Sequence, residues 1–534
     1  MKSLANHNNS TQNPMTKNQS YTIRISLIVA LGGFLMGFDA SVISGVVKFI
    51  ETEFDLTKLE LGWSVASLTL TATLAMMVSG PLSDRYGRRK VLQVAAILYA
   101  ISAFGSAVAP DFVSLVIARM IGGFGVGASL ILAPMYIAEI APPAMRGRLV
   151  SFNQLNIVIG ISVAFFTNYL ILQLGELDSD WALSLGFEKW NWRWMLGLEF
   201  LPAVLFYVGL FFVPKSPRWL VMKGQTDQAM LIMNQFTNLE DAKKQINDAI
   251  RSIHEEKDKE KVKLTEFFKP AYRLVLIIGV VIAILQQITG INSVFFYAPM
   301  IFEQSGIGTD ASFIQAILVG LTNLVFTVLA ILFIDRLGRK PLLLLGLAGI
   351  ALCMGLLAYG FGDATYELTS ESVKTLPTEI NQERLAPLIQ TIFEDDVSFK
   401  EAIRESLGEK DALAYESNLI TAAIQMNPTL ILVGILGFVA SFAISIGPVM
   451  WVLFSELFPI HIKGAAISFV GFINSLISYL VQQFFPWQLD TMGSSTTFLL
   501  YGLFAALGFF FVIFVVPETK NKSLEELEEI LIKR

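Results

Sequence analysis

The sequence has little charge, almost no cysteine and almost no histidine. Charged residues make up 16% and hydrophobic residues 54% of 534 residues, whereas a soluble protein of this length carries about 25% charged residues. Cys353 is the only cysteine, which excludes an intramolecular disulfide and a thiolate metal site. The three histidines lie outside the apolar runs, and no pair of a nucleophile and a base stands out. We therefore expect no metal, no cofactor and no enzymatic activity.

The first twenty residues are polar and lack the basic-then-apolar pattern of a secretory signal, so we expect the amino end to stay in the cytoplasm. The net charge of -6 comes from acidic loops between apolar runs and does not indicate a nucleic acid partner.

Long apolar runs recur along the whole chain. A run of about twenty residues spans roughly 30 Å of hydrocarbon. No polar stretch is long enough to form a separate soluble domain around these runs, so we interpret them as membrane spans. They predict an all-α integral membrane protein with twelve transmembrane helices, near residues 22–47, 61–81, 91–109, 112–137, 149–173, 193–213, 273–302, 312–334, 341–361, 428–455, 464–486 and 496–516.

Basic and acidic residues alternate between successive loops. DRYGRRK (84–90) and DRLGRK (335–340) are basic, whereas ETEFD (51–55), GELDSD (175–180) and the segment 362–427, with 13 acids and 5 bases, are acidic. The positive-inside rule places the basic loops and both termini in the cytoplasm.

The basic loops also show an internal repeat. GPLSDRYGRRK (80–90) resembles FIDRLGRKP (333–341), and AEIAPPAMRG (138–147) resembles SELFPIHIKG (455–464). The repeat predicts two pseudo-symmetric bundles of six helices. The second half is longer by a segment that must lie at 362–427, which is either a small ordered cap or a solvated acidic loop.

Five regions follow from these patterns. They are a polar amino-terminal tail (1–21), a first six-helix bundle (22–221), a cytoplasmic linker with short amphipathic helices (222–272), a second six-helix bundle (273–520) with its outer insertion (362–427), and a carboxyl-terminal tail (521–534).

Several motifs in the expected order resemble the sugar porter branch of the major facilitator superfamily. The resemblance runs from about residue 22 to 528, apart from the insertion. It rests on GFDASVISG, DRYGRRK, APMYIAEIAPPAMRGR, PKSPRWL, QQITGINSVFFYAP, DRLGRKP, GPVMWVLFSELFP and PETKNKSLEEL. It implies the major facilitator fold and a transporter that rocks around a site near the membrane midplane.

Three charges lie well inside the predicted spans: Asp39, Arg119 and Glu199. Each costs roughly 2.5–3.5 kcal/mol or more at a helix centre unless it finds a partner or water. Counted from the outer ends of their helices, all three lie at a depth of roughly 9–14 Å, so they can meet.

This matching depth predicts a proton-coupling site. Asp39 would carry the proton, pairing with Arg119 when deprotonated and releasing it when protonated, while Glu199 holds Arg119. The resemblance agrees, because proton-coupled sugar porters have Asp at the position of Asp39, where passive members usually have Asn. The alternative is an ion-pair cluster that only fixes helix packing.

Uncharged polar side chains recur in mid-span. Amides both donate and accept hydrogen bonds, as sugar hydroxyls do. Gly290 and the pair Gly447–Pro448 are expected to interrupt their helices beside such a site. The resemblance implies sugar contacts for Gln154, Gln286, Gln287, Asn292, Tyr297, Asn323, Trp451 and Asn474.

Other readings of the amides stay open. Any single amide could instead be interhelical glue, and Gln482 and Gln483 match no sugar contact. Phe296, Ser475 and Met36 depart from residues common in the family, so the sequence leaves open a pentose, a hexose or a polyol.

The loop motifs predict a cytoplasmic gate of weak ion pairs that can open in every cycle. The alternative is that they only signal topology. The gate residues are Asp84, Arg85, Arg88, Arg89, Glu139, Arg146, Asp335, Arg336, Arg339, Glu456 and Lys463.

Taken together, the sequence predicts a secondary transporter that moves a monosaccharide by alternating access, coupled to proton symport, in the plasma or inner membrane. The expected partners are the sugar, the proton and the lipid bilayer, with no obligatory protein partner. A passive facilitator and a sugar sensor that does not transport are the alternatives.

Overall fold

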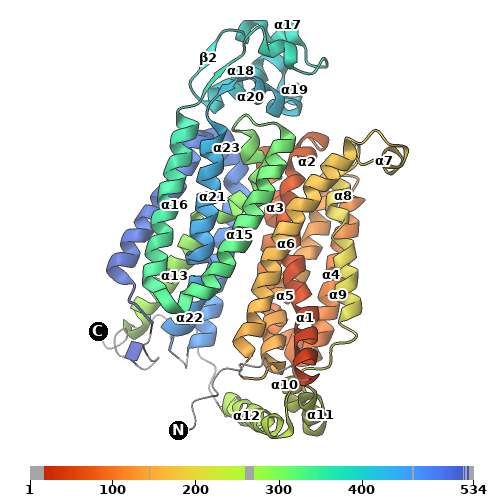
Figure 1. The fold of residues 1–534 in the computed structure, drawn as a ribbon, viewed down its shortest axis with the longest axis vertical. Helices are drawn as coiled ribbons and strands as arrows, with labels where there is room; N and C mark the ends of the chain where they lie inside the picture. The colour runs from red at the N-terminus through yellow and green to blue at the C-terminus, as the bar shows by residue number, and fades with distance from the viewer. Residues whose placement is uncertain are drawn as a thin grey trace, which may run out of the picture.

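The structure is a computed structural model that describes residues 17–143, 145–258, 270–459, 462–520, 522 and 526–527. The expected tails therefore lie mostly outside the described residues, as does part of the linker. Two upright groups of helices stand side by side, with a small module on one end and short helices on the other (Figure 1). We call these ends the cap side and the terminal side, because the first long helix begins and the last long helix ends on the side of the short helices.

The first bundle contains residues 17–209. Capping boxes begin two of its long helices: Thr57 precedes α3 and pairs with Glu60 in its first turn, and Asp111 precedes α5 and pairs with Ser114 in its first turn. Its helices are α1 (Lys17–Val42), η1 (Ile43–Gly45), α2 (Val47–Glu53), α3 (Lys58–Tyr86), α4 (Arg88–Ala107), α5 (Phe112–Ile140), α6 (Arg146–Gly175), α7 (Asp180–Leu185), α8 (Asn191–Gly197) and α9 (Phe200–Gly209).

The second bundle follows a set of short helices on the terminal side. These are α10 (Pro217–Met222), α11 (Thr226–Phe236) and α12 (Leu239–Asp258), of which α11 and α12 are amphipathic. The bundle itself is built from η3 (Pro270–Tyr272), α13 (Arg273–Ile288), α14 (Ile291–Glu303), α15 (Thr309–Leu337), α16 (Arg339–Gly362), α21 (Pro428–Ile444), α22 (Ile446–Leu457) and α23 (Lys463–Val515).

The described residues contain ten helices long and apolar enough to cross a membrane. The 53-residue α23 holds two spans, because Gly493 breaks it with φ 77°. The predicted span at 193–213 consists of the two short helices α8 and α9. The twelve predicted spans are therefore present, and the predicted fold class is confirmed.

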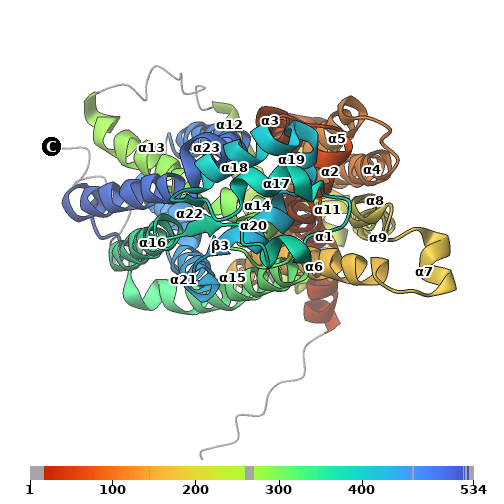
Figure 2. The same cartoon turned by 90° about the horizontal axis from the view of Figure 1, so that it is seen from above.

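The acidic insertion is an ordered module on the cap side, as Figures 1 and 2 show. A three-stranded antiparallel sheet, in the order β2-β1-β3, packs against helices around a core that includes Tyr366, Phe399 and Leu419. Its elements are β1 (Thr365–Glu367), η4 (Ser372–Thr375), α17 (Gln382–Leu385), η5 (Ala386–Leu388), β2 (Ile392–Phe393), α18 (Asp396–Leu407), α19 (Glu409–Ala414), α20 (Glu416–Ala423) and β3 (Ile424–Gln425). We call this module, residues 363–427, the cap.

The two bundles meet along two helix pairs, α3 with α23 and α6 with α15. Close approach along α3 depends on Gly62, because a Cβ there would lie 1.9 Å from the carbonyl oxygen of Gln483. These contacts position polar residues of both bundles next to one another.

Candidate transport site

Asp39 and Arg119 form a buried ion pair inside the first bundle. The Arg119 Nη1 donates to Asp39 Oδ1 at 3.2 Å, and its Nε donates to the carbonyl oxygen of Ser64 at 3.0 Å. The side chains are only 1% and 2% exposed. The matching depths predicted from the sequence thus correspond to a direct contact between α1 and α5.

Glu199 lies close to this pair without joining it. It occupies the break between α8 and α9 and interacts electrostatically with Asp39 and Arg119. Its Oε1 is buried and has no hydrogen-bond partner, and no ion pair joins it to Arg119. In this conformation Arg119 is held by Asp39, and Glu199 is the unengaged second carboxylate.

Four of the predicted amides form one hydrogen-bonded network in the second bundle. Gln287 Nε2 donates to Gln286 Oε1 at 2.7 Å and to Asn474 Oδ1 at 3.0 Å. Asn292 Nδ2 donates to Gln287 Oε1 at 2.7 Å, and Asn474 Nδ2 donates to Gln286 Oε1 at 2.6 Å. The network brings together side chains from α13, α14 and α23.

The network continues into residues that the sequence did not single out as sugar contacts. Asn292 Nδ2 and Gln482 Nε2 both donate to Ser478 Oγ, at 2.6 and 2.8 Å. Thr69 in the first bundle donates to Gln482 Oε1 at 2.7 Å, so the network crosses between the bundles. The spacing of Asn474, Ser478 and Gln482 at every fourth residue of α23 is the signal that would have identified Ser478.

Tyr297 joins α14 to α23 beside the amide network. Its hydroxyl donates to the carbonyl oxygen of Gln482 at 3.0 Å. It is fully buried at a point where α14 departs from helical geometry, with φ -130°. Tyr297 therefore fixes the kinked part of α14 to the segment of α23 whose Gln482 side chain reaches the first bundle.

Helix breaks lie beside the network. Gly290, with φ 90°, separates α13 from α14 as expected. The other break is at Ser445, between α21 and α22, not at Gly447–Pro448. The break lies before the proline because Pro448 has no N–H to donate to the carbonyl oxygen of Ile444. In a continuous helix its ring would also clash with that carbonyl.

Three predicted sugar contacts lie outside the hydrogen-bonded network. Gln154 on α6 is exposed, and Asn323 on α15 is buried. Trp451 on α22 is 49% exposed, and its ring makes an edge contact with Phe454. No hydrogen bond joins the side chains of these three residues to the four amides of the network in this conformation.

The predicted gate residues form the same arrangement in each half. Arg88 bridges Asp84 at 2.7 Å and Glu139 at 3.2 Å, and Glu139 also accepts a hydrogen bond from Ser216. In the second half, Arg339 bridges Glu456 at 2.8 Å, and Thr519 donates to Glu456 at 2.6 Å.

The remaining gate residues occupy the same terminal side. Arg89 donates to the carbonyl oxygen of Phe211 at 3.1 Å, and Arg85 stacks on Tyr86. The carbonyl oxygen of Arg336 accepts from Lys520, and Lys463 begins α23. The side chain of Asp335 lies outside the described part of the structure.

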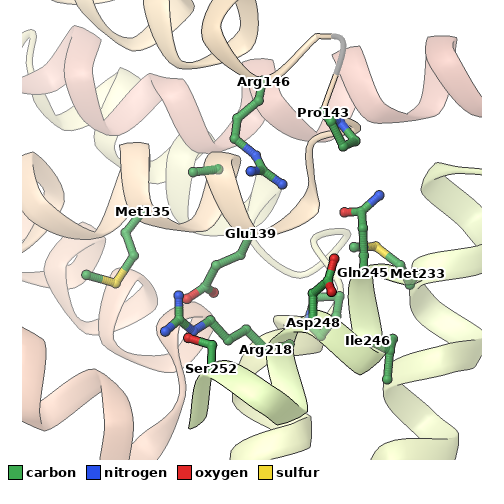
Figure 3. Close-up of a pocket in the computed structure, with 13 residues that line it drawn as sticks. Met135, Glu139, Pro143, Arg146, Arg218, Met233, Gln245, Ile246, Asp248 and Ser252 are labelled. Atoms are coloured by element: carbon green, nitrogen blue, oxygen red, sulfur yellow. The ribbon is translucent and has the colours of Figure 1, made fainter. Parts of the chain in front are cut away.

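Glu139 and Arg146 line a cavity of about 430 Å³ between α5, α10 and α12, and both point into it in Figure 3. Among the described gate residues, every ion pair stays within one bundle. The gate is therefore assembled in each half, and in this conformation no ion pair between two gate residues with described side chains joins the halves.

On the cap side, in contrast, charges do connect the bundles. Lys48 of α2 pairs with Glu303 of α14 at 2.7 Å and donates to Thr309 at 2.7 Å. Lys58 of α3 pairs with Glu51 at 2.6 Å and approaches Glu416 of the cap at 3.8 Å. The bundles are thus held together at this end.

A two-bundle helical fold with broken helices and buried polar groups between its halves is that of a secondary transporter. The family described as "Sugar (and other) transporter" matches residues 25–375 and 412–531. The chain is 35% identical to the arabinose-proton symporter of Bacillus subtilis, over 97% of both chains. It is 34% identical to the D-xylose-proton symporter of Escherichia coli over 96% of both, and 32% identical to the glucose transport protein of Synechocystis over 97% of this chain and 99% of that one.

Solved structures agree with these relatives. The inward-open xylose transporter XylE of E. coli superposes with a TM-score of 0.72 at 32% identity, covering 96% of this chain and 100% of that chain. The XylE structure bound to 6-bromo-6-deoxy-D-glucose, at 33% identity and 96% and 100% coverage, gives 0.67.

The chain belongs to the sugar transporter family of the major facilitator superfamily. It is therefore a multi-pass membrane transporter of the sugar class and not an enzyme, which confirms the family and activity class predicted from the sequence.

Proposed function

We propose that this protein is a proton-coupled symporter of a monosaccharide, either a pentose or a hexose. The observation that carries the proposal is the buried Asp39–Arg119 ion pair. The amide network of the second bundle reaches the first bundle through the Thr69–Gln482 hydrogen bond, and its side chains suit sugar hydroxyls. The activities named for the relatives, arabinose-proton and xylose-proton symport, support the same reading.

The coupling follows from the ion pair. Protonation of Asp39 removes the charge that holds Arg119, so Arg119 is released toward Glu199, its unengaged second carboxylate. A buried arginine must keep a partner, so its transfer between two carboxylates favours two different bundle arrangements. If the sugar binds best to the arrangement in which Asp39 is protonated, the uptake of the sugar depends on the uptake of the proton.

The gate pairs support an alternating-access cycle. In this conformation the cap side is closed by Lys48–Glu303, while no ion pair between the described gate side chains joins the halves on the terminal side. We assign the terminal side to the cytoplasm, because its loops are basic, and the protein to the plasma or inner membrane with both termini inside. The gate residues would then join the halves when the cap side opens.

Sugar uptake by Asp39→Asn in proteoliposomes tests the proposal. With one proton per sugar, a pH difference of one unit supplies about 1.4 kcal/mol and drives about tenfold accumulation. The wild type should accumulate sugar and alkalinise the outer medium, whereas Asp39→Asn should only equilibrate it. Exchange of labelled for unlabelled sugar should persist in the variant.

Asp178→Asn, a neutralised exposed carboxylate in an outer loop, serves as the matched control and should accumulate sugar as the wild type does. If the wild type itself moves sugar without protons, the protein is a passive facilitator. If Asp39→Asn still accumulates sugar, Asp39 is not the coupling group.

A further inference from the structure

Several oxygen atoms in the first bundle are buried without a hydrogen-bond partner. They include Asp39 Oδ2, Glu199 Oε1, the hydroxyl of Tyr99 on α4 and that of Ser129 on α5. Leaving one such group unsatisfied costs about 1–3 kcal/mol, so several in one place require an explanation.

The four groups lie in one region. A Cβ at Gly122 of α5 would lie 3.5 Å from Asp39 Oδ2, and a Cβ at Gly125, nearly one turn closer to the terminal side, would lie 3.2 Å from Cδ2 of the Tyr99 ring. Ser129 follows about one turn further along α5. The Tyr99 ring is thus packed against α5 between the level of Asp39 and that of Ser129, and Glu199 lies close to Asp39.

The same region is closed to solvent. Asp39 and Glu199 are 1% and 2% exposed, and Tyr99 is fully buried. A proton on Asp39 therefore has no direct exit, although no ion pair between the described gate side chains joins the halves on the terminal side. Ser129 lies ten residues beyond Arg119 along α5, about 15 Å nearer the terminal side. A route through Tyr99 and Ser129 leads from the ion pair in that direction.

We propose that the hydroxyl of Tyr99 relays the coupling proton between Asp39 and the terminal side, with Ser129 as the next group. The Asp39 carboxyl passes its proton through a water molecule to the Tyr99 oxygen, while the hydrogen of the Tyr99 hydroxyl passes through a second water molecule to Ser129. Asp39 is left as a carboxylate, and Tyr99 ends neutral, as it began. This inference rests on the proposed symport.

The charges around the relay are few. Among the described residues, Asp39 and Glu199 are the charged groups near Tyr99, and Arg119 pairs with Asp39. The relay therefore acts next to two groups that change partners during the cycle. Tyr99 belongs to α4 of the first bundle, whereas the amide network belongs to the second bundle.

The variant Tyr99→Phe keeps the ring and removes only the hydroxyl. Because that hydroxyl has no partner in the structure, the variant should fold as well as the wild type. Proton-driven uptake and proton release into the liposome lumen should fall about tenfold or more, as expected for the loss of a proton-transfer group. Sugar exchange at equal pH should stay within twofold of the wild type.

The solvent isotope effect gives a readout that a packing role would not change. Uptake by Tyr99→Phe should become more sensitive to D2O than uptake by the wild type, because proton transfer becomes rate-limiting. Ser129→Ala should show the same effect in weaker form. Tyr207→Phe, which removes a half-buried hydroxyl from α9 of the same bundle, is the control. It should change neither the rate of proton-driven uptake nor its sensitivity to D2O.

The relay and the proposed function fail differently. Normal proton-driven uptake by Tyr99→Phe, together with loss of accumulation in Asp39→Asn, overturns the relay and leaves symport intact. Equal loss of uptake and exchange in Tyr99→Phe also overturns it, because the residue is then structural. Absence of proton movement in the wild type overturns both.

Discussion

Gln287 has both ends of its amide engaged within the network. Its Nε2 donates to Gln286 and Asn474, and its Oε1 accepts from Asn292. Gln287 therefore orients the other three amides of the network. A sugar hydroxyl can both donate and accept a hydrogen bond, so it can replace one of these amide partners and still satisfy the Gln287 side chain.

Gln287→Ala should weaken sugar binding about 10–100-fold, since it removes about 1.4–2.8 kcal/mol of direct and orienting hydrogen bonds. Equilibrium titration of the purified protein with xylose, arabinose and glucose measures the effect. Gln245→Ala, on α12 outside the membrane-spanning helices, is the control and should bind as the wild type does. Unchanged affinity for all three sugars in Gln287→Ala would show that the amides serve packing instead.

Single residues were predictable where their chemistry is rare for their surroundings. Asp39 and Arg119 stand out as charges in apolar helices, and helix geometry sufficed to match their depths. The unengaged state of Glu199 was not predictable, because it depends on the break between α8 and α9. Tyr99 and Ser129 gave no signal, since Tyr and Ser are ordinary in membrane helices and only the packing reveals their neighbours. Ser478 was detectable only through its spacing of four residues from Asn474 and Gln482.

The break between α13 and α14 determines where the amides point. Gly290 takes φ 90°, and a Cβ there would lie 2.4 Å from the ring of Tyr501. Tyr501 itself contacts Ser293 through its hydroxyl, at 3.2 Å. The turn at Gly290 thus sets the position of Gln286 and Gln287, which precede it, and of Asn292, which follows it, relative to α23.

Gly290→Ala should lower the free energy of unfolding by about 2 kcal/mol or more, combining the left-handed backbone cost with displacement of the Tyr501 ring. The apparent Tm of the purified protein should fall, and sugar affinity should fall with it. Gly355→Ala, in α16 where a Cβ meets nothing within 4 Å, should leave the Tm unchanged or raise it. A Gly290→Ala protein with wild-type Tm and affinity would contradict this role for the turn.

Elements were predictable by their apolar length but not by their continuity. The spans near 464–486 and 496–516 are read from apolar runs, yet the structure joins them into α23 with a kink at Gly493. The span near 193–213 is divided in two where Pro202, in the first turn of α9, has no N–H to donate to the carbonyl oxygen of Leu198. The break predicted at Gly447–Pro448 is found at Ser445, because a proline interrupts the hydrogen bonding of the helical turn that precedes it.

At the scale of the whole molecule, the cap joins the two bundles. Glu416 Oε1 accepts from Gln304 of α14 at 3.0 Å and pairs with Lys400 of the cap at 3.4 Å, while its other oxygen faces Lys58 of α3. Asp396 of the cap also accepts from Ser494 of α23. Residues 376–411 lie outside the stretches that match the family, so the sequence located this insertion but not its contacts.

The charge on Glu416 persists across the range in which the transporter would work. Burial raises its pKa, but Lys58, Lys400 and the bond from Gln304 outweigh burial and lower the pKa to about 2. A carboxyl whose folded pKa is depressed stabilises the folded state above its unfolded pKa, about 4.5, and loses that contribution as the pH falls toward 2. Any pH dependence of transport between pH 5 and 8 therefore does not come from Glu416.

Glu416→Gln should shift the protein toward the arrangement that is open on the cap side. Lys58 approaches Glu416 only while α3 and the cap are close, and bonds to a charged group contribute about 1.5–3 kcal/mol, so the ratio of the two arrangements should change about 10–100-fold.

Spin labels on Thr52→Cys and Gly308→Cys, in a Cys353→Ser background, measure the separation of the bundles on this side. The distance distribution should move to longer values in Glu416→Gln at pH 7 and stay unchanged in Glu405→Gln, a control for an exposed carboxylate of the cap. An unchanged distribution in Glu416→Gln would mean that Lys48–Glu303 and the helix contacts alone close this side. The cap would then be attached to the second bundle without changing the equilibrium between the two arrangements.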